Sequence, residues 1–423
     1  MVYVKDFKGN DDNEIIENAV RYRDEDGVVV LTKRVSDVDP ARDYWLLDRA
    51  IVLPENTTFV LRNCKIKLSD KCRDNFFRSA NCGLGIEYPQ PIEKIYIKGE
   101  GYSVLEGADH PRSTGDSSKI QACPCPYKNE DLLAFADWVS AESKEKGITN
   151  FDEQHSHSYG TDTGKEGESQ FGDWRNIGIL LANVENFSIE NVHIVCSHGW
   201  GISLEACAYG NVDKIDFDSC MSKTIDGMVN NIENQDGIDL RNGCHDITIT
   251  NITGTTGDDV IALTAIASET DGKVGGTLND THVMHSEWTR RDKNIHNVII
   301  RGVRATSDLC ALIRLLPCNT RIWNVIIDEV IDTCPENKTH RCGVLIGTPD
   351  GVYGKNLEDS NSNVTISNVV THADEGIEVR GYLSNSAITN VINTRSDSPV
   401  LKFYRRNSLK NVVTSNLVET HES

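Results

Sequence analysis

The chain has 423 residues, of which 38% are hydrophobic, and it carries a formal net charge of −21. Its 11 prolines and 32 glycines exclude collagen-like and proline-rich classes, and no apolar run reaches the roughly 20 residues that a membrane-spanning helix needs. The negative charge argues against nucleic acid and anionic membranes as partners, because both are themselves negatively charged.

The beginning of the chain and its cysteines predict the compartment. The first residues, MVYVKDFKGN, carry charges where a secretion signal has an apolar core, so we expect a cytoplasmic protein. The 13 cysteines are an odd number and no export signal accompanies them. We therefore expect reduced thiols, several of them acting as small buried hydrophobic residues.

Two segments differ from the rest of the chain. Residues 1–60 predict a strand, a helix over Asn13–Arg23 and an apolar strand, VVVLTKR, which together would form an N-terminal cap. Residues 108–172 form a long polar insertion with one predicted helix, Asn129–Lys146. Insertions of this length are usually functional or disordered, so we expect a wall of a binding cleft, with a mobile decoration as the alternative.

A short motif recurs through the remaining chain: an alternating apolar and polar strand followed by Asn or another turn-forming residue. The copies are Asn186–Ile194, Asn211–Ser219, His245–Thr253, His296–Ala305, Trp323–Asp332, Ser362–Val370 and Asn385–Asn393. The residues that follow the strands are Asn191, Asn251, Gly302, Glu329, Asn368 and Asn390. Successive members of this set are separated by one or two repeat units of 20–30 residues, plus loop insertions.

A repeat of this length with two-residue alternation predicts an all-β solenoid, a parallel β-helix, because one short strand cannot bury its inner face alone. The recurring Asn suits a bend between strands, since Asn tolerates a left-handed backbone. No Pro/Gly/Ser-rich linker divides the chain, so we predict one elongated domain over residues 1–423.

Two neighbouring coils concentrate carboxylates. The segments are NQDGID at 234–239 and GDD at 257–259, and Asp236 and Asp258 are 22 positions apart, the length of one coil. Coils stack at about 4.8 Å, so these aspartates, with Asp239 beside them, are expected on one patch. Like charges at that distance raise at least one pKa, as an acid–base pair for glycosidic cleavage requires. Gly257 is expected to allow a bend that brings Asp258 and Asp259 onto one surface.

Two other interpretations of these aspartates are open. Asp-Gly and Gly-Asp are common turn dipeptides, so each carboxylate could be a solvated turn residue. Clustered carboxylate oxygens also suit Ca²⁺.

At this point the residues resemble a known family. NQDGID followed by GDDVIAL resembles the paired signatures of family 28 glycoside hydrolases, the polygalacturonase-like enzymes of the pectin-lyase-like superfamily. Two further stretches, Ile92–Gly107 and Ile179–Leu204, are similar to coils of that family, and the likeness covers about residues 90–393. The resemblance implies a single-stranded right-handed parallel β-helix and hydrolysis with inversion. It also implies Asp258 as general acid, with Asp236 and Asp259 activating water.

The resemblance extends to substrate-binding positions. The family's Gly-His-Gly has no clear copy here, and the corresponding segment Thr281–Arg291 contains His282 and His285, either of which could tune the aspartates. The alternative for each is a loop histidine without a role. The family's Arg-Ile-Lys corresponds to Arg314-Leu315-Leu316, so Arg314 is expected to bind a substrate carboxylate while the lysine is missing.

Side chains of four further residue types, Trp, His, Asp and Cys, are candidate ligand contacts. Trp200 could stack on a sugar or pack at a coil corner, and His198 beside it is a weaker candidate. Asp239 is expected to bind substrate with them. Cys123-Pro124-Cys125 lacks a second pair at zinc-ligand spacing, so no metal or other cofactor is expected.

The first hypothesis is therefore an inverting hydrolase of an oligosaccharide. The insertion and the expected cytoplasmic location favour exo-cleavage, and the chain could be a monomer or a homo-oligomer. The alternatives are a β-helix polysaccharide lyase that uses Ca²⁺ and an Arg or Lys base, and a non-catalytic carbohydrate-binding β-helix of the tailspike type.

Overall fold

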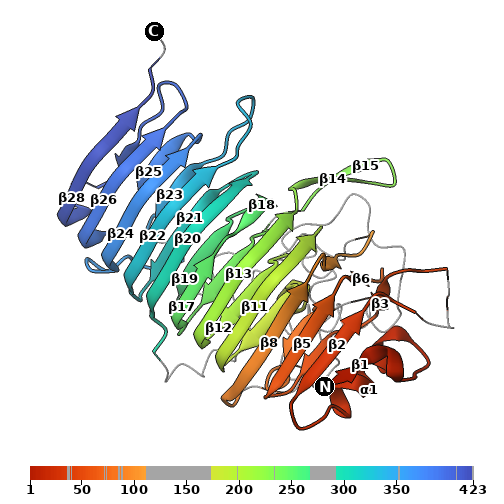
Figure 1. The fold of residues 1–423 in the computed structure, drawn as a ribbon. Helices are drawn as coiled ribbons and strands as arrows, with labels where there is room; N and C mark the ends of the chain where they lie inside the picture. Colours follow the sequence, from red (N-terminus) through yellow and green to blue (C-terminus); the bar gives the residue numbers. More distant parts are fainter. Residues whose placement is uncertain are drawn as a thin grey trace, which may run out of the picture.

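The computed structural model describes residues 1–35, 39, 41–70, 72, 74–83, 86, 89–110, 173–197, 199–232, 234–266, 292–350, 353–405 and 407–421. Successive coils of the chain stack along the molecule and build two long sheets, from the N-terminal end to β28 (Leu409–Glu419) (Figure 1). Nearly all of the predicted insertion, with its helix and its Cys-Pro-Cys segment, lies outside the described residues. None of the helices in the described ranges is long and apolar enough to cross a membrane.

The larger sheet, sheet A, has 16 strands. They are β1 (Val2–Tyr3), β2 (Val28–Thr32), β3 (Trp45–Leu47), β5 (Thr57–Arg62), β6 (Lys65–Leu68), β8 (Ile92–Glu100), β9 (Val104–Glu106), β11 (Val184–Val195), β13 (Ala208–Asp218), β17 (His245–Thr250), β18 (Thr253–Thr256), β20 (Ile295–Ser307), β22 (Ile322–Asp332), β24 (Asn361–Thr371), β26 (Leu383–Asn393) and β28. The repeat copies that the sequence shows are therefore all strands of sheet A.

The second sheet, sheet B, has 10 shorter strands. They are β4 (Ile51–Leu53), β7 (Phe77–Ser79), β10 (Ile179–Ala182), β12 (Ile202–Glu205), β16 (Ile238–Arg241), β19 (Ile261–Ile266), β21 (Ala311–Cys318), β23 (Cys342–Ile346), β25 (Glu375–Val379) and β27 (Leu401–Phe403). A separate antiparallel hairpin joins β14 (Ser222–Ile225) to β15 (Met228–Asn231). A short 3₁₀ turn covers Val4–Asp6, and another covers Asp173–Asn176.

Neighbouring strands within both sheets are parallel, so successive coils superpose residue on residue. Alternate side chains of each sheet meet in one apolar core, for example Val298 and Ile300 of β20 against Ile313 and Leu315 of β21. The two sheets thus form a right-handed parallel β-helix, as the sequence predicts.

The strands of sheet A bend at left-handed residues. Among the described residues, 16 of the 25 non-glycine residues with positive φ are Asn. All six residues marked in the sequence repeat have positive φ, including Glu329 at 57° and Gly302 at 73°. Asn tolerates this conformation because its side chain is short and hydrogen-bonds locally. The Asn side chains also bond to one another from coil to coil: Asn324 donates to Asn297 at 2.9 Å and accepts from Asn363 at 3.1 Å.

An N-terminal helix covers the first coils (Figure 1). It is α1 (Asp12–Arg21), which begins one residue before and ends two residues before the predicted Asn13–Arg23. The Asp11 side chain accepts a hydrogen bond from the Glu14 N–H at 2.7 Å and so caps the helix. The apolar side of α1, with Ile16 and Ala19, joins the main core. The role of residues 1–60 as a cap stays a prediction.

The cysteines follow the expectation from composition. The 11 cysteines in the described ranges are free thiols, and eight of them are buried. Burial raises the pKa of the Cys64 and Cys244 thiols to about 12, which keeps both protonated and unreactive at neutral pH.

The Asn ladder leads to a stability prediction. Replacing Asn324 with Ala removes two side-chain hydrogen bonds and leaves at φ 54° a residue that tolerates the left-handed backbone less well than Asn does. We expect the free energy of unfolding to fall by about 2 kcal/mol, measured by urea denaturation. The matched control, Asn324→Gly, loses the same bonds but tolerates the backbone, so it should lose about 1 kcal/mol less. Equal losses for Ala and Gly would show that the left-handed corner contributes nothing.

Candidate active site

The expected carboxylates lie on the outer side of sheet B and where two of its inner strands begin. In β16, Ile238 and Leu240 point into the core, so Asp239 between them points outward. In β21, Ile313 and Leu315 are core residues, which places Arg314 on the same outer side. Asp239 pairs with Ala262, which in turn pairs with Arg314, so one coil separates these two charged residues.

Asp236, Asp258 and Asp259 come together where β16 and β19 begin. Because Ile238 pairs with Ile261, Asp236 lies opposite Asp259, an offset of 23 positions. The 22-residue spacing in the sequence predicts Asp258, and not Asp259, opposite Asp236. Asp258 instead lies in a bend, and its N–H donates to the Gln235 carbonyl at 3.3 Å. The bend shifts the register by one residue and brings both aspartates beside the preceding coil.

Gly257 is needed at this bend for a different reason from the expected one. It is not among the residues with positive φ. A β-carbon there would lie 3.0 Å from Gln235 Cβ and 3.2 Å from the Met221 nitrogen. Close approach of the coils, and not an unusual backbone conformation, therefore requires glycine at position 257.

Asp259 has its partners in the next coil. It is 1% exposed, one carboxylate oxygen accepts the Ala311 N–H at 2.9 Å, and the other lies 3.2 Å from Arg314 Nη1. Arg314 is thus bound by a protein carboxylate. This contact competes with the role expected for Arg314 in binding a substrate carboxylate.

Asp258 has the chemistry of a general acid. Its side chain is half-buried, and one oxygen accepts the Asp259 N–H at 2.9 Å. Burial raises its pKa to about 7, and the negative charge of Asp259 acts in the same direction. Arg314, the Asp259 N–H and the Cys310 thiol lower the pKa and only partly offset these effects. A carboxyl group with this pKa keeps much of its proton near neutral pH.

Asp236 and Asp239 are buried with incomplete hydrogen bonding. Burial raises the pKa of each well above the usual range; the charge of Asp239 adds to the effect at Asp236, and Arg241 partly offsets it at Asp239. Both oxygens of Asp239 and the Oδ1 atom of Asp236 have no hydrogen-bond partner in the described part of the chain. Buried polar atoms normally have partners, so these oxygens are suited to contacting water or a ligand hydroxyl.

Trp200 lies beside this patch but is buried. It is 5% exposed, packs with Trp174 and Leu180, and has the guanidinium carbon of Arg241 at 4.5 Å from its ring centroid. These contacts favour the coil-packing alternative over sugar stacking. The other expected contacts, His198, His282 and His285, lie outside the described residues, so their roles stay predictions.

Two side-chain groups have potential metal-ligand atoms within 4.8 Å of one another. One consists of Asp258, Asp259 and Cys310, and sequence reasoning missed its thiol because no motif marks Cys310, 51 residues after Asp259. A thiol does not suit Ca²⁺, and Arg314 already pairs with Asp259. This donor set therefore fits the expected calcium alternative poorly.

The second group consists of Asp332, Cys334 and His340. Asp332 Oδ2 contacts His340 Nε2 at 2.6 Å and also accepts the Thr371 hydroxyl at 3.1 Å and the His372 N–H at 2.8 Å. These bonds join two neighbouring coils, so the carboxylate has a structural role.

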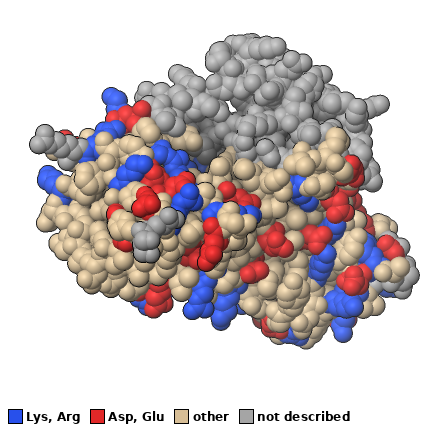
Figure 2. Space-filling model, turned by 90° about the horizontal axis from the view of Figure 1, so that it is seen from above, with Lys and Arg blue, Asp and Glu red and all other residues tan. Residues whose placement is uncertain are grey.

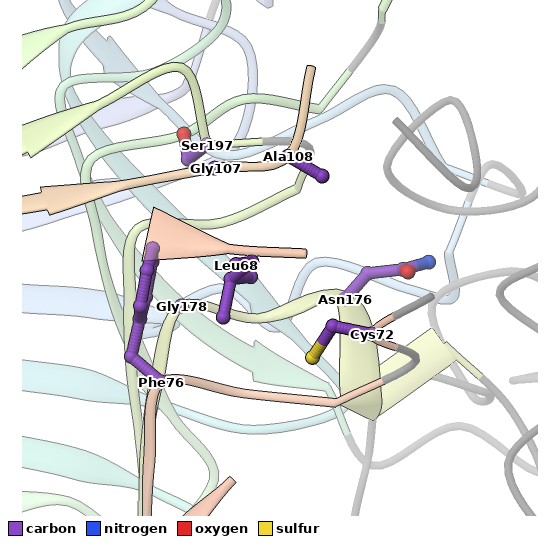
Figure 3. Close-up of a pocket in the computed structure, with 8 residues that line it drawn as sticks. All are labelled: Leu68, Cys72, Phe76, Gly107, Ala108, Asn176, Gly178 and Ser197. Carbon is purple, nitrogen blue, oxygen red and sulfur yellow. The ribbon is translucent and has the colours of Figure 1, made fainter. Parts of the chain in front are cut away.

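A pocket of about 360 Å³, open to solvent, lies toward the N-terminal coils (Figure 3). It is lined by Leu68, Cys72, Phe76, Gly107, Ala108, Asn176, Gly178 and Ser197. Gly178 donates to Trp200 one coil on, and Gly201 to Asp236 one coil further, so the pocket lies two coils before the aspartates. The described residues of its lining include no carboxylate, in contrast to the aspartate patch.

The aspartates lead to a pH-dependent stability prediction. The pKa of Asp258 is about 7 in the folded chain against a reference value of 3.8, so the fold loses stability as pH rises from 3.8 to 7 and keeps it below 3.8. Asp258→Asn should raise the free energy of unfolding by up to about 4 kcal/mol at pH 8 and by about 1 kcal/mol at pH 4.5, measured by denaturant titration.

The control for this measurement is Asp359→Asn, because Asp359 is exposed and pairs with Arg321 at 2.9 Å. It should change stability by less than about 1 kcal/mol at either pH. An Asp258→Asn effect of equal size at both pH values would contradict the raised pKa.

The sequence matches no protein-family model and no curated protein. Among solved structures, the polygalacturonase from Erwinia carotovora ssp. carotovora is similar, with 13% identity, a TM-score of 0.57, and coverage of 98% of this chain and 93% of that one.

Two other solved structures are similar over 98% of this chain. The exopolygalacturonase from Thermotoga maritima is 15% identical, with a TM-score of 0.52 and 91% of its chain covered. The tailspike protein of E. coli bacteriophage HK620, in complex with a pentasaccharide, is 12% identical, with a TM-score of 0.52 and 66% of its chain covered. The chain therefore has the right-handed parallel β-helix fold of polygalacturonases and related pectin-lyase-like proteins.

Proposed function

We propose that this protein is an inverting glycoside hydrolase that cleaves an oligosaccharide at a chain end. The observation that carries the proposal is the unequal environment of neighbouring carboxyl groups: Asp258 has a pKa of about 7, while Asp259 beside it faces Arg314 at 3.2 Å. Carboxyl groups in different environments are the requirement for a proton donor and a base at one glycosidic bond.

In the proposed reaction Asp258 donates its proton to the leaving glycosidic oxygen. Asp236 and Asp259 hold a water molecule, and the Asp259 carboxylate accepts its proton while the water oxygen bonds to the anomeric carbon from the opposite side. Arg314 and the Ala311 N–H hold the Asp259 carboxylate in place during this step. Asp239, whose oxygens are unpartnered in the described part of the chain, would bind a sugar hydroxyl.

A short substrate is part of the proposal. A cytoplasmic location is part of the proposal, because intact polysaccharide does not enter the cytoplasm, and acid–base hydrolysis requires no cofactor. The expected lysine is replaced by Leu316, which is 3% exposed, and Arg314 is paired with Asp259. A carboxylate clamp of the expected kind is therefore incomplete at this position.

The acid assignment is tested by Asp258→Asn. We expect kcat to fall by roughly 10³-fold on oligogalacturonides or neutral glycosides, whichever the wild-type protein cleaves. Asp359→Asn, which changes an exposed carboxylate on another part of the surface, should leave the rate unchanged. Full activity of the Asp258→Asn variant would remove Asp258 from the mechanism.

The pH profile gives a second test. The general acid must be protonated, so kcat/KM should decline as pH rises through about 7, where Asp258 loses its proton. A rate that stays constant from pH 6 to 9 would contradict the role of Asp258 as the acid.

A non-catalytic function is the second candidate, because a carbohydrate-bound tailspike protein shares the fold. That function predicts saccharide binding without product release, and equal binding by wild-type and Asp258→Asn proteins. The lyase alternative predicts an unsaturated product that absorbs in the near ultraviolet and a loss of activity in EDTA. Measurements of product release, near-ultraviolet absorbance and sensitivity to EDTA therefore separate the three functions.

A further inference from the structure

A pair of arginines lies further along the outer side of sheet B. Arg314 pairs with Leu345, and Leu345 pairs with Glu378 of β25, so Glu378 is two coils beyond Arg314, about 10 Å along the axis. Ile377 and Val379 beside Glu378 are core residues, which places Glu378 on the outer side like Arg314. Arg341 precedes β23, and Arg380 follows β25.

Glu378 orients both arginines. Its side chain is 0% exposed; one oxygen accepts from Arg341 Nε at 3.0 Å and the other from Arg380 Nε at 2.6 Å. A buried carboxylate with both oxygens engaged holds the two guanidinium groups in place. The cluster has two positive charges and one negative charge.

The other ends of the guanidinium groups are available. Each arginine bonds Glu378 through Nε, and the Nη atoms of Arg341 and Arg380 have no hydrogen-bond partner among the described residues. The two side chains are 34% and 21% exposed. Unpaired Nη atoms on fixed guanidinium groups form the planar donor array that binds a carboxylate.

Tyr404 flanks the pair. Its ring centroid is 5.2 Å from the Arg380 guanidinium carbon and 5.3 Å from Lys402 Nζ, and the residue is 54% exposed. Lys402 pairs with Glu375 at 2.5 Å, so its charge is compensated. The excess positive charge of the cluster therefore belongs to the two arginines.

We propose that Arg341 and Arg380 bind the carboxylate of a uronate unit in the saccharide, with Arg341 two coils and Arg380 three coils beyond Asp258 and Asp259. The proposal rests on the hydrolase function proposed above and specifies its substrate. It assigns the carboxylate contact to this pair because Arg314 is already bound by Asp259. Figure 2 shows Lys and Arg side chains among acidic ones on the face seen there. Arg341 and Arg380 carry one more charge than Glu378 neutralises, so an anionic ligand can meet local positive charge despite the net charge of −21.

The test measures binding directly, by calorimetry with trigalacturonate, in the Asp258→Asn background where the substrate is not consumed. Arg341→Gln and Arg380→Gln should each weaken binding about tenfold, and the trimethyl ester of trigalacturonate should bind about tenfold more weakly than the free acid. Arg321→Gln is the matched control, since Arg321 also pairs with one carboxylate but lies beside β22 of sheet A, and it should leave the affinity unchanged.

Lysine variants keep the test decisive if the Gln variants do not fold. Arg341→Lys and Arg380→Lys retain a cation beside Glu378 and lose the planar fork, so they should also weaken binding of the free acid. Equal affinity for acid and ester, unchanged binding in the folded variants, or no binding of trigalacturonate would each overturn the proposal. Tighter binding of a sulfated or phosphorylated trisaccharide would overturn the uronate assignment.

The same measurements separate this proposal from the hydrolase function. If the Asp258→Asn protein binds trigalacturonate through Arg341 and Arg380 but the wild-type protein releases no product, the subsite stands and the hydrolase function fails. If the wild-type protein hydrolyses substrate and the arginine variants keep their KM, the function stands and the subsite fails.

Discussion

Hydrogen bonding between superposed coils is the interaction on which the rest of this structure depends. Parallel pairing repeats along both sheets, and each coil must turn at the same places for the next one to pair. Left-handed residues make those turns: Asn368, Asn390 and Asn416 all have φ near 50°, and their side chains bond from coil to coil. Loops of different length leave the stack undisturbed because they lie outside these corners.

The same stacking creates the acidic patch. Pairing of Ile238 with Ile261 places Asp236 opposite Asp259, although neither aspartate is part of a strand. Burial and the negative charge of Asp259 both disfavour ionisation of Asp258, so its pKa rises to about 7. The cost to stability is tolerable because β16 and β19 are held by paired neighbours on both sides. A rigid stack can therefore hold an electrostatically unfavourable cluster where a flexible loop would separate it.

Charge varies along the outer side of sheet B. Asp239 and Arg241 lie in β16, Arg314 lies two strands on, and Glu378 with its two arginines lies two strands further. Sites with opposite charge thus occur at fixed multiples of the coil spacing. In the functions proposed above, a chain of sugar units lying along this side would meet acid–base groups at one position and anion-binding groups at another.

The sequence by itself determined the strands of sheet A, their left-handed corners, the cap helix and the carboxylate cluster, because these depend on local alternation, turn preference and one-coil spacing. Only the tertiary structure decided which partners the site residues have. Asp259 takes Arg314, Arg241 covers Trp200, and Glu378 orients two arginines 37 and 2 positions away. Such contacts join coils through loops of unequal length, so no sequence period identifies them. The physical reason is that register, and not distance along the chain, sets which side chains meet.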